Sequence, residues 1–532
     1  MRPVRSSAIL ALSLSVAAVG LTACGGGSAG SSGSGGSKYA DGKTFTLALS
    51  ADPGALDPQG SASSPLFQVT KFAYDTLVSV DAKGEVTSGL ASKWSVSGTT
   101  VTFDIGQGIT CADGAPFTAQ TAVDNITYVE DPKNKSPFLG VFVPAGATAK
   151  ASGSTVTVTL ATASPFVLDS FANLPMVCDA GMKDRASLKD ATNGTGPYTL
   201  KEGVPGDHYT YAIRKGYTWG PAGAKTSTKG MPATIEVKIV PNETTAANEL
   251  LSGALNAAAI HGADATRLEA AKLDHDDAEA IVGEQWYNHN AGHATSDPAV
   301  REALTKSLDL AQLQKVITSD RGGPATQLAV VAPAGCTGSS VEGNVAATDV
   351  AAAESALDAA GYVKGADGMR AKAGKPLSLS FIYDSSLGSG GSAAAELAVA
   401  AWKKIGVAVK AKQLDETGVV NAMFGTGDWD VSWEPLNINT PEQGVPFFSG
   451  PTVKGGGNNM AAITNADYDA GVKKAMGEVG VQSCPDWLAA EAALFKANDL
   501  VLFANSVLPF FAKGAELDVL GSVVPTSIRM LG

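Results

Sequence analysis

The residues whose chemistry depends most on their spacing are four cysteines, Cys111, Cys178, Cys336 and Cys484. A structural zinc site would need C-x-x-C or C-x-x-H pairs, and the sequence has none, which argues against a metal cluster. An even number of cysteines in an exported chain is typical of disulfides, and four cysteines allow three pairings. Cys111 and Cys178 lie in one region of the chain, and Cys336 and Cys484 lie in another. We therefore predict the bonds Cys111–Cys178 and Cys336–Cys484.

Catalytic constellations are absent from the sequence. Its one G-x-S-x-G match, Gly26 to Gly30, lies in a Gly/Ser-rich stretch, and the sequence contains no H-E-x-x-H and no S-x-x-K followed by S-D-N and K-T-G. His289 and His293 have the i, i+4 spacing of a helical metal pair, but the intervening Asn-Ala-Gly predicts a strand that runs into a loop. We expect no catalytic residue, no cofactor and no structural metal, and an envelope hydrolase stays the rival interpretation because a nucleophile and its base can lie far apart in sequence.

The first 42 residues predict export and attachment to a membrane. Arg2 and Arg5 precede an uncharged run of 14 residues, which is too short to span a bilayer and fits a signal peptide over 1–23. Leu21-Thr22-Ala23-Cys24 resembles the bacterial lipobox, which implies that Cys24 carries lipid. The Gly/Ser-rich segment that follows, 24–42 with Cys24, is expected to be a flexible linker. The protein would then be extracytoplasmic and anchored to the cell membrane. The alternative is an ordinary signal peptide with an incidental cysteine.

Composition favours a large folded body. Hydrophobic residues make up 44% of the 532-residue chain and charged residues 17%, enough for two or three domains. The net charge is −13, and no dense Lys/Arg cluster with interleaved aromatic residues is present, so nucleic acid is not an expected partner.

Hydrophobic periodicity predicts an α/β chain with mixed sheets and two lobes. Alternation typical of strands occurs at 44–49, 99–105, 154–160, 234–240, 377–383 and 407–412. A helix is predicted over 118–129, with Thr118 as its N-cap, and another over 393–404. A last long helix is predicted over 487–502, followed by a strand over 507–511.

A series of short phrases in a fixed order resembles a known family. They are LDP at 56–58, YDTLV at 74–78, GLASKW at 89–94, VTFDI at 101–105, ADG at 112–114, FTA at 117–119, GTGPY at 194–198, VREAL at 300–304, GY at 361–362, IGV at 405–407 and GDWD at 427–430. Together they are similar to the solute-binding proteins of peptide-type ABC importers, a family that includes oligopeptide, dipeptide and nickel binders.

The resemblance implies a periplasmic-binding-protein-like fold whose two lobes close on a small solute. Lobe I would comprise 43–79, 191–285 and 501–532, with an extra subdomain over 80–190, and lobe II would comprise 286–500. The expected partners are a peptide-like solute and an ABC permease in the membrane, and we expect a monomer. A non-peptide solute, such as a sugar or a metal chelate, and a sensor role without transport stay open.

The resemblance also places candidate ligand-binding residues after the strand at 430–432. Trp433 occupies the position where the family's tryptophan faces the ligand, although the alternative is a core tryptophan. In oligopeptide binders an aspartate three residues after that tryptophan pairs with the peptide amino group, but this chain has Leu436 there. Glu434, Glu442 or the neutral Asn437 could replace it.

Two further groups complete the predicted site. Ser63, Ser64 and Phe67 lie in or beside the loop after the first strand, at a lobe edge that the family uses for ligand contact, although a polar turn would explain them equally well. Trp286, Tyr287 and Asn290 lie where the chain would cross between the lobes, which makes them candidates for either hinge or ligand contact.

Overall fold

A computed structural model describes residues 38–478 and 480–532. Its main element is an 11-stranded mixed sheet with the strand order β18-β17-β19-β12-β20-β11-β1-β10-β9-β8, and β13 pairs with β20. These strands are β1 Thr44–Leu49, β8 Tyr198–Val204, β9 His208–Ile213, β10 Thr234–Ile239, β11 Ala257–Ala259, β12 Asp274–Tyr287, β13 Gly322–Gly323, β17 Ser378–Asp384, β18 Ala408–Leu414, β19 Val431–Trp433 and β20 Leu500–Ala512. The predicted α/β fold with mixed sheets is confirmed.

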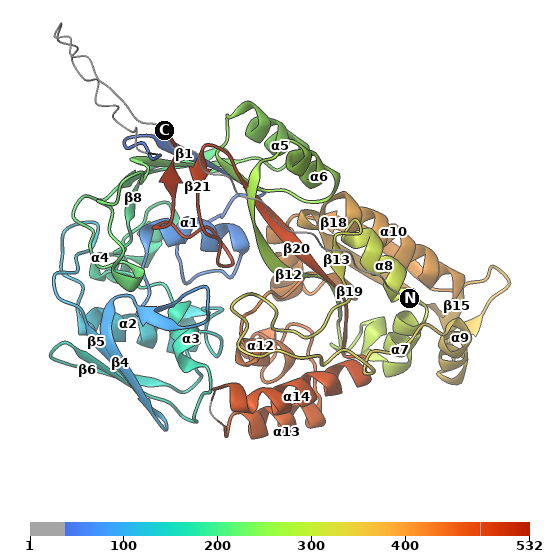
Figure 1. Ribbon diagram of the computed structural model, residues 1–532. Helices are drawn as coiled ribbons and strands as arrows, with labels where there is room; N and C mark the ends of the chain where they lie inside the picture. The colour runs from blue at the N-terminus through green and yellow to red at the C-terminus, as the bar shows by residue number, and fades with distance from the viewer. Residues whose placement is uncertain (1–37, 479) are drawn as a thin grey trace, which may run out of the picture. The chain divides into compact units, whose positions relative to one another are not determined.

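Two long antiparallel strands, β12 and β20, connect the halves of this sheet (Figure 1). Their register runs from Asp274 opposite Ala512 to Trp286 opposite Leu500. The last residues of β20 pair with β11, whereas the last residues of β12 pair with β19. The register shifts on both sides of Gly283, where an added Cβ would lie 2.6 Å from the Cβ of Ala504. Glycine is therefore required at this irregularity in the paired strands.

The first half of the sheet is built on β1, which pairs in parallel with β10 and β11. Alternating residues of β1 point into an apolar core, and Phe45 and Leu47 are fully buried there. Helix α1 (Ser64–Ala73) packs into the same core through Phe72. The helices α5 (Glu243–Ser252) and α6 (Gly262–Ala270) pack on each other and near β11.

A separate four-stranded sheet lies within residues 80–190, in the order β4-β5-β7-β6. Its strands are β4 Ala91–Ser97, β5 Thr100–Ile105, β6 Thr148–Ser152 and β7 Thr155–Thr159. Helix α2 (Ala119–Glu130) packs on it, and the predicted N-cap is confirmed because Thr118 Oγ1 accepts a hydrogen bond from Thr121 N at 3.1 Å. The predicted Cys111–Cys178 disulfide is present in this region.

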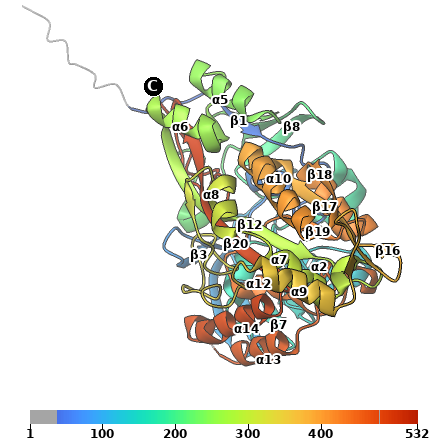
Figure 2. The same cartoon turned by 90° about the vertical axis from the view of Figure 1, so that its right-hand side faces the viewer.

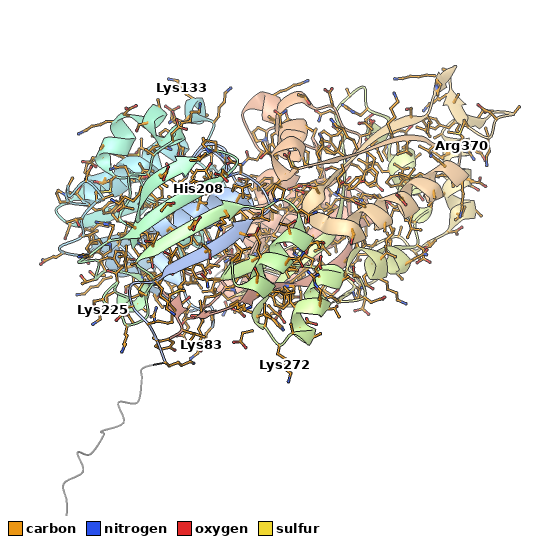
Figure 3. The ribbon with its side chains drawn as sticks, turned by 90° about the horizontal axis from the view of Figure 1, so that it is seen from above. Lys83, Lys133, His208, Lys225, Lys272 and Arg370 are labelled. Atoms are coloured by element: carbon orange, nitrogen blue, oxygen red, sulfur yellow. A yellow bond between two sulfur atoms is a disulfide. The ribbon has the colours of Figure 1, made fainter. Side chains whose placement is uncertain are left out.

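The second half of the sheet is parallel, with β17 between β18 and β19. Helix α10 (Gly388–Lys404) packs against β17 and β18 (Figure 2). Other helices of this half are α7 Pro298–Lys306, α8 Leu310–Ile317, α9 Val350–Ala359, α12 Pro441–Phe448, α13 Ala466–Ala475 and α14 Cys484–Lys496. The predicted Cys336–Cys484 disulfide is present and joins α14 to a long connecting segment. Arg370 of this half and His208 of the first half lie on opposite sides of Figure 3.

One predicted helix was too long. The helix expected over 487–502 ends at Lys496, and β20 begins at Leu500, seven residues before the expected strand. Asn498 has a positive φ of 50°, which ends the helical path between the two elements. The predicted signal peptide, Cys24 and most of the linker lie outside the described residues. Among the helices that are described, none is both long and apolar enough for a membrane span.

Candidate solute-binding site

Three acidic residues meet where the parallel strands of the second half end. Asp384 is the last residue of β17, Glu434 directly follows β19, and Glu416 lies two residues beyond the end of β18. The register places Tyr383 opposite Trp433 and Asp384 opposite Leu414, so all three strands end at one edge. Ligands of open α/β sheets bind outside the carboxyl ends of the strands. This edge is therefore where a ligand is expected.

A fourth carboxyl group joins them from the crossing strand β12. Glu284 is fully buried, and its Oε2 accepts a hydrogen bond from Leu436 N at 2.5 Å. Its other oxygen, Oε1, has no hydrogen-bond partner. Glu284 is close enough to Glu434 to raise the pKa of that residue by charge repulsion. We call Asp384, Glu416, Glu434 and Glu284 the carboxyl cluster.

The carboxyl cluster touches the first half of the molecule at the start of α1. Glu416 Oε1 accepts a hydrogen bond from the main-chain N–H of Ser64 at 2.7 Å. The N-cap residue, Ser63, makes no side-chain capping bond, so this orphan N–H at the helix start is satisfied by a carboxylate from the other half. The positive end of the helix dipole favours such a carboxylate.

Burial raises the pKa of every member of the carboxyl cluster. Burial is the largest cause in each case, and it raises the pKa of Glu416 to about 7 and that of Glu284 to about 8. The pKa of Glu434 is raised well above its ordinary value by burial, then by the charges of Asp384 and Glu416. Burial also raises the pKa of Asp384.

An aromatic pair lies beside Glu434. The indole of Trp286 is fully buried, and its Nε1 donates a hydrogen bond to the main-chain oxygen of Glu434 at 2.9 Å. Phe448 stacks on this indole with ring centroids 5.2 Å apart. The arrangement of apolar rings with a few polar groups is the usual composition of a small-molecule site.

Comparison with known proteins identifies the family. The model of the bacterial extracellular solute-binding proteins, family 5 Middle, matches residues 85–459. The chain belongs to family 5. As a member of this family it is an extracytoplasmic solute-binding protein of an ABC importer.

Relatives and solved structures agree with this assignment. Protein XP55 of Streptomyces lividans is 26% identical over 401 residues, which cover 72% of this chain and 68% of XP55. The oligopeptide-binding protein OppA of Bacillus subtilis is 26% identical over 341 residues, 59% of this chain and 61% of OppA. The structure of AppA from Bacillus subtilis, in complex with a nonapeptide, superposes with a TM-score of 0.78 at 16% identity and covers 93% of this chain and 100% of AppA. This chain therefore has the two-lobed fold of family 5.

The structure brings together some of the residues that the family 5 resemblance suggested. Ser64 contacts the carboxyl cluster directly, Ser63 precedes it as the helix N-cap, and Glu434 is part of the cluster. Trp286 bonds to the Glu434 main chain. Phe67 lies one turn along α1, half-buried, and stacks on Phe138 with ring centroids 5.8 Å apart.

The remaining predicted residues serve the packing around the site. Trp433 is fully buried in the core of the second half, and its Nε1 donates to Gln285 Oε1 at 3.0 Å. The hydroxyl of Tyr287 accepts from Gln285 Nε2 at 2.5 Å, in the same core. Asn290 donates through Nδ2 to Asn288 Oδ1 at 2.8 Å. These contacts match the core alternative that the sequence left open for Trp433.

Asn437 and Glu442 also have protein partners. Asn437 Oδ1 accepts from Ile281 N at 2.8 Å, and its Nδ2 donates to Ile281 O at 3.2 Å, so its amide completes β12 beside the register shift. Glu442 is buried, and its Oε2 accepts from Phe166 N at 3.1 Å. Both side chains therefore hold main-chain groups in place.

The histidines do not form a metal pair. His289 is packed near Asp499, and burial lowers its pKa to about 3, whereas His293 Nδ1 lies 3.1 Å from Asp430 Oδ1. Within 38–478 and 480–532, no group of three or more metal-ligating side chains could hold a metal ion.

Asp384, Glu416 and Glu284 were missed in the sequence prediction. A signal for two of them was present, because 377–383 and 407–412 were recognised as strands and an acidic residue follows each one closely. Glu284 gave no such signal, since it lies inside the strand β12 and does not follow the end of one.

Proposed function

We propose that this family 5 protein is a lipoprotein that holds a peptide or peptide-like solute between two lobes and delivers it to a membrane permease. In this proposal lobe I comprises 43–79, 191–285 and 501–532 with the extra subdomain 80–190, and lobe II comprises 286–500. Cys24 carries the lipid anchor, the protein works as a monomer, and the solute leaves chemically unchanged. The nonapeptide bound to AppA and the name of OppA support a peptide-like solute.

The observation that carries the proposal is the contact between Ser64 and Glu416. It joins the start of α1 to the carboxyl ends of the parallel strands, two places that the sheet order puts far apart. A solute held there would touch both lobes at once and would favour the closed arrangement by its greater affinity for it. We propose Ser63, Ser64 and Phe67 from lobe I and Trp286 and Glu434 from lobe II as its contacts.

Identification of the bound solute tests this proposal. The protein would be purified without denaturant, and the small molecules that it releases on unfolding would be identified by mass spectrometry. The same molecule, added back at 100 times its dissociation constant, should stabilise the ligand-free protein by about 2.7 kcal/mol. Recovery of the molecule unchanged after long incubation is expected, whereas its conversion to a product would support the hydrolase alternative.

Uptake measurements separate an importer from a sensor. A strain that lacks the gene should lose uptake of the identified solute, and a copy with Cys24→Ala should be released from the membrane fraction. Normal uptake in the deletion strain would refute the transport role while leaving solute binding intact.

A further inference from the structure

Phe166 is an aromatic residue of the segment 80–190 that is buried against the other half of the molecule. It directly precedes α3 (Val167–Ala172), and its side chain is 6% exposed. The other buried members of its apolar cluster all come from 286–500, and we call them the Phe166 socket: Cys336, Ala475, Cys484 and Trp487. The socket includes the Cys336–Cys484 disulfide, which holds two of its members together.

The socket has no space for another side chain where the ring of Phe166 enters. An added Cβ on Gly335 would lie 3.0 Å from Phe166 Cε1 and 3.1 Å from Thr440 Cγ2. Carbon atoms in ordinary van der Waals contact are about 3.5–4.0 Å apart. The φ of Gly335 is not positive, so space and not backbone conformation calls for glycine at this position.

The main chain of Phe166 is also held by the other half. Its N–H donates a hydrogen bond to Glu442 Oε2 at 3.1 Å, and Glu442 is a buried residue of α12. Hydrogen bonds to an acid are stronger than those between neutral groups. The ring and the N–H of one residue are thus both bound by 286–500.

Further contacts extend along the seam between 80–190 and 286–500. Asn458 Nδ2 donates a hydrogen bond to the main-chain oxygen of Pro137 at 2.9 Å. An added Cβ on Gly140 would lie 3.0 Å from Pro446 Cγ, so these two segments are also in close contact. The seam is therefore packed at several places.

A second main-chain N–H of the first half is held by an acid from 286–500. The N–H of Ser64 donates to Glu416 Oε1 at 2.7 Å, at the carboxyl cluster. Ser64 lies in α1 and Phe166 precedes α3, so the two hydrogen bonds report on the contact between the halves at two separate places.

We propose that Phe166 is a latch: its ring, seated in the socket, holds 80–190 on 286–500 and stabilises the closed arrangement of the two lobes. This inference rests on the lobe division of the proposed function. Burial of one phenylalanine side chain changes an equilibrium constant by about 10- to 100-fold. A solute that binds the closed arrangement gains apparent affinity when this arrangement is more populated, so the latch would strengthen binding without contacting the solute.

Hydrogen exchange, resolved to single amides by mass spectrometry, tests the latch in the solute-free protein. An amide that is protected by a contact exchanges when that contact opens, so its rate reports the open fraction. The amide of residue 166 reports on the latch, and that of Ser64 reports on the carboxyl cluster. The amide of Ser170 is the internal control, because its bond to the main-chain oxygen of Phe166 at 3.0 Å lies within 80–190.

Two variants disturb the latch from opposite sides. Phe166→Ala removes the ring, and Gly335→Ala fills the space that the ring enters, so one variant decides if the other does not fold. Phe171→Ala is the matched control, because Phe171 is fully buried and pairs with Phe103 inside 80–190, with ring centroids 5.3 Å apart. Thermal unfolding of each protein verifies that it is folded.

Both latch variants should accelerate exchange at residues 166 and 64 together, by about 10- to 100-fold relative to wild type. The amide of Ser170 should keep its rate, because the segment 80–190 itself stays folded. In Phe171→Ala, by contrast, the amide of Ser170 should exchange faster and that of Ser64 should not change.

Four results would overturn the inference. An unprotected amide at residue 166 in the wild type would mean that the latch is not engaged. Unchanged rates in both latch variants would show that the ring does not hold the seam, and faster exchange at residue 166 alone would make it a local contact. Faster exchange at Ser170 in these variants would indicate unfolding of the segment. The proposed function fails on different grounds, namely if the protein releases no solute and its deletion leaves uptake unchanged.

Discussion

Replacing Glu284 by glutamine should stabilise the ligand-free protein, and the gain should grow with pH. Glutamine keeps the acceptor for Leu436 N and removes the group that burial holds at a pKa of about 8 instead of 4.5. A raised carboxyl pKa means that the folded state binds more protons than the unfolded state between these two values, so wild-type stability falls as pH rises through that interval. At about 1.4 kcal/mol per pKa unit, the full difference is about 3–5 kcal/mol.

Urea unfolding of solute-free protein at pH 4.5, 6, 7 and 8.5 measures this difference. Wild type and Glu284→Gln should have nearly equal free energies of unfolding at pH 4.5, and the variant should be more stable by several kcal/mol at pH 8.5. The charged neighbours Asp384, Glu416 and Glu434 stay in both proteins and cancel to first order. Glu85→Gln, an exposed site, is the control and should change stability little at any pH. A stability difference that is independent of pH would refute the argument that Glu284 is a buried, unpaired acid.

Other substitutions test contacts that stabilise the fold around the site. Asn437→Ala should cost about 1–3 kcal/mol in urea unfolding because it leaves the N–H and carbonyl groups of Ile281 without partners; an unchanged midpoint would contradict that role. The double change Cys336→Ser and Cys484→Ser opens a cross-link across 148 residues and should lower stability by about 3–5 kcal/mol, as measured by thermal unfolding without reductant. Trp433→Ala should lower stability by about 3–5 kcal/mol because the indole is fully buried. Weaker solute binding with unchanged stability would instead favour a ligand-facing Trp433.

Much of the fold could be predicted because single strands with one buried face have an unmistakable alternation. The strand predicted at 44–49 is β1, and the one predicted at 154–160 contains β7. The helix predicted over 487–502 wrongly included the start of β20. This strand is covered on both faces over much of its length, so its sequence is a continuous apolar run. Such a run fits a buried helix as well as a buried strand. Only the pairing with β12, which is distant in sequence, decides between them.

The site was less predictable because it depends on strand order. Ser64 and Glu416 are 352 residues apart, and no local pattern indicates that their elements meet. Glu434 was weighed for its closeness to Trp433 in sequence, whereas its acidic neighbours follow from the parallel pairing of β17 with β18 and β19. The acid inside β12 depends on a further pairing, antiparallel to β19.

Asp384, Glu416 and Glu434 lie at or just beyond the ends of their strands, so the proposed solute contacts at this edge are separate from the strands that form the scaffold. The backbone pairing of β17, β18 and β19 ends at Asp384, Leu414 and Trp433. Substituting the side chains at these ends therefore removes no backbone hydrogen bond between the strands. In the proposed site, substitutions at these few places would change the groups that face the solute without a new architecture. An engineer who seeks a different specificity should therefore begin with this rim and leave the strands alone.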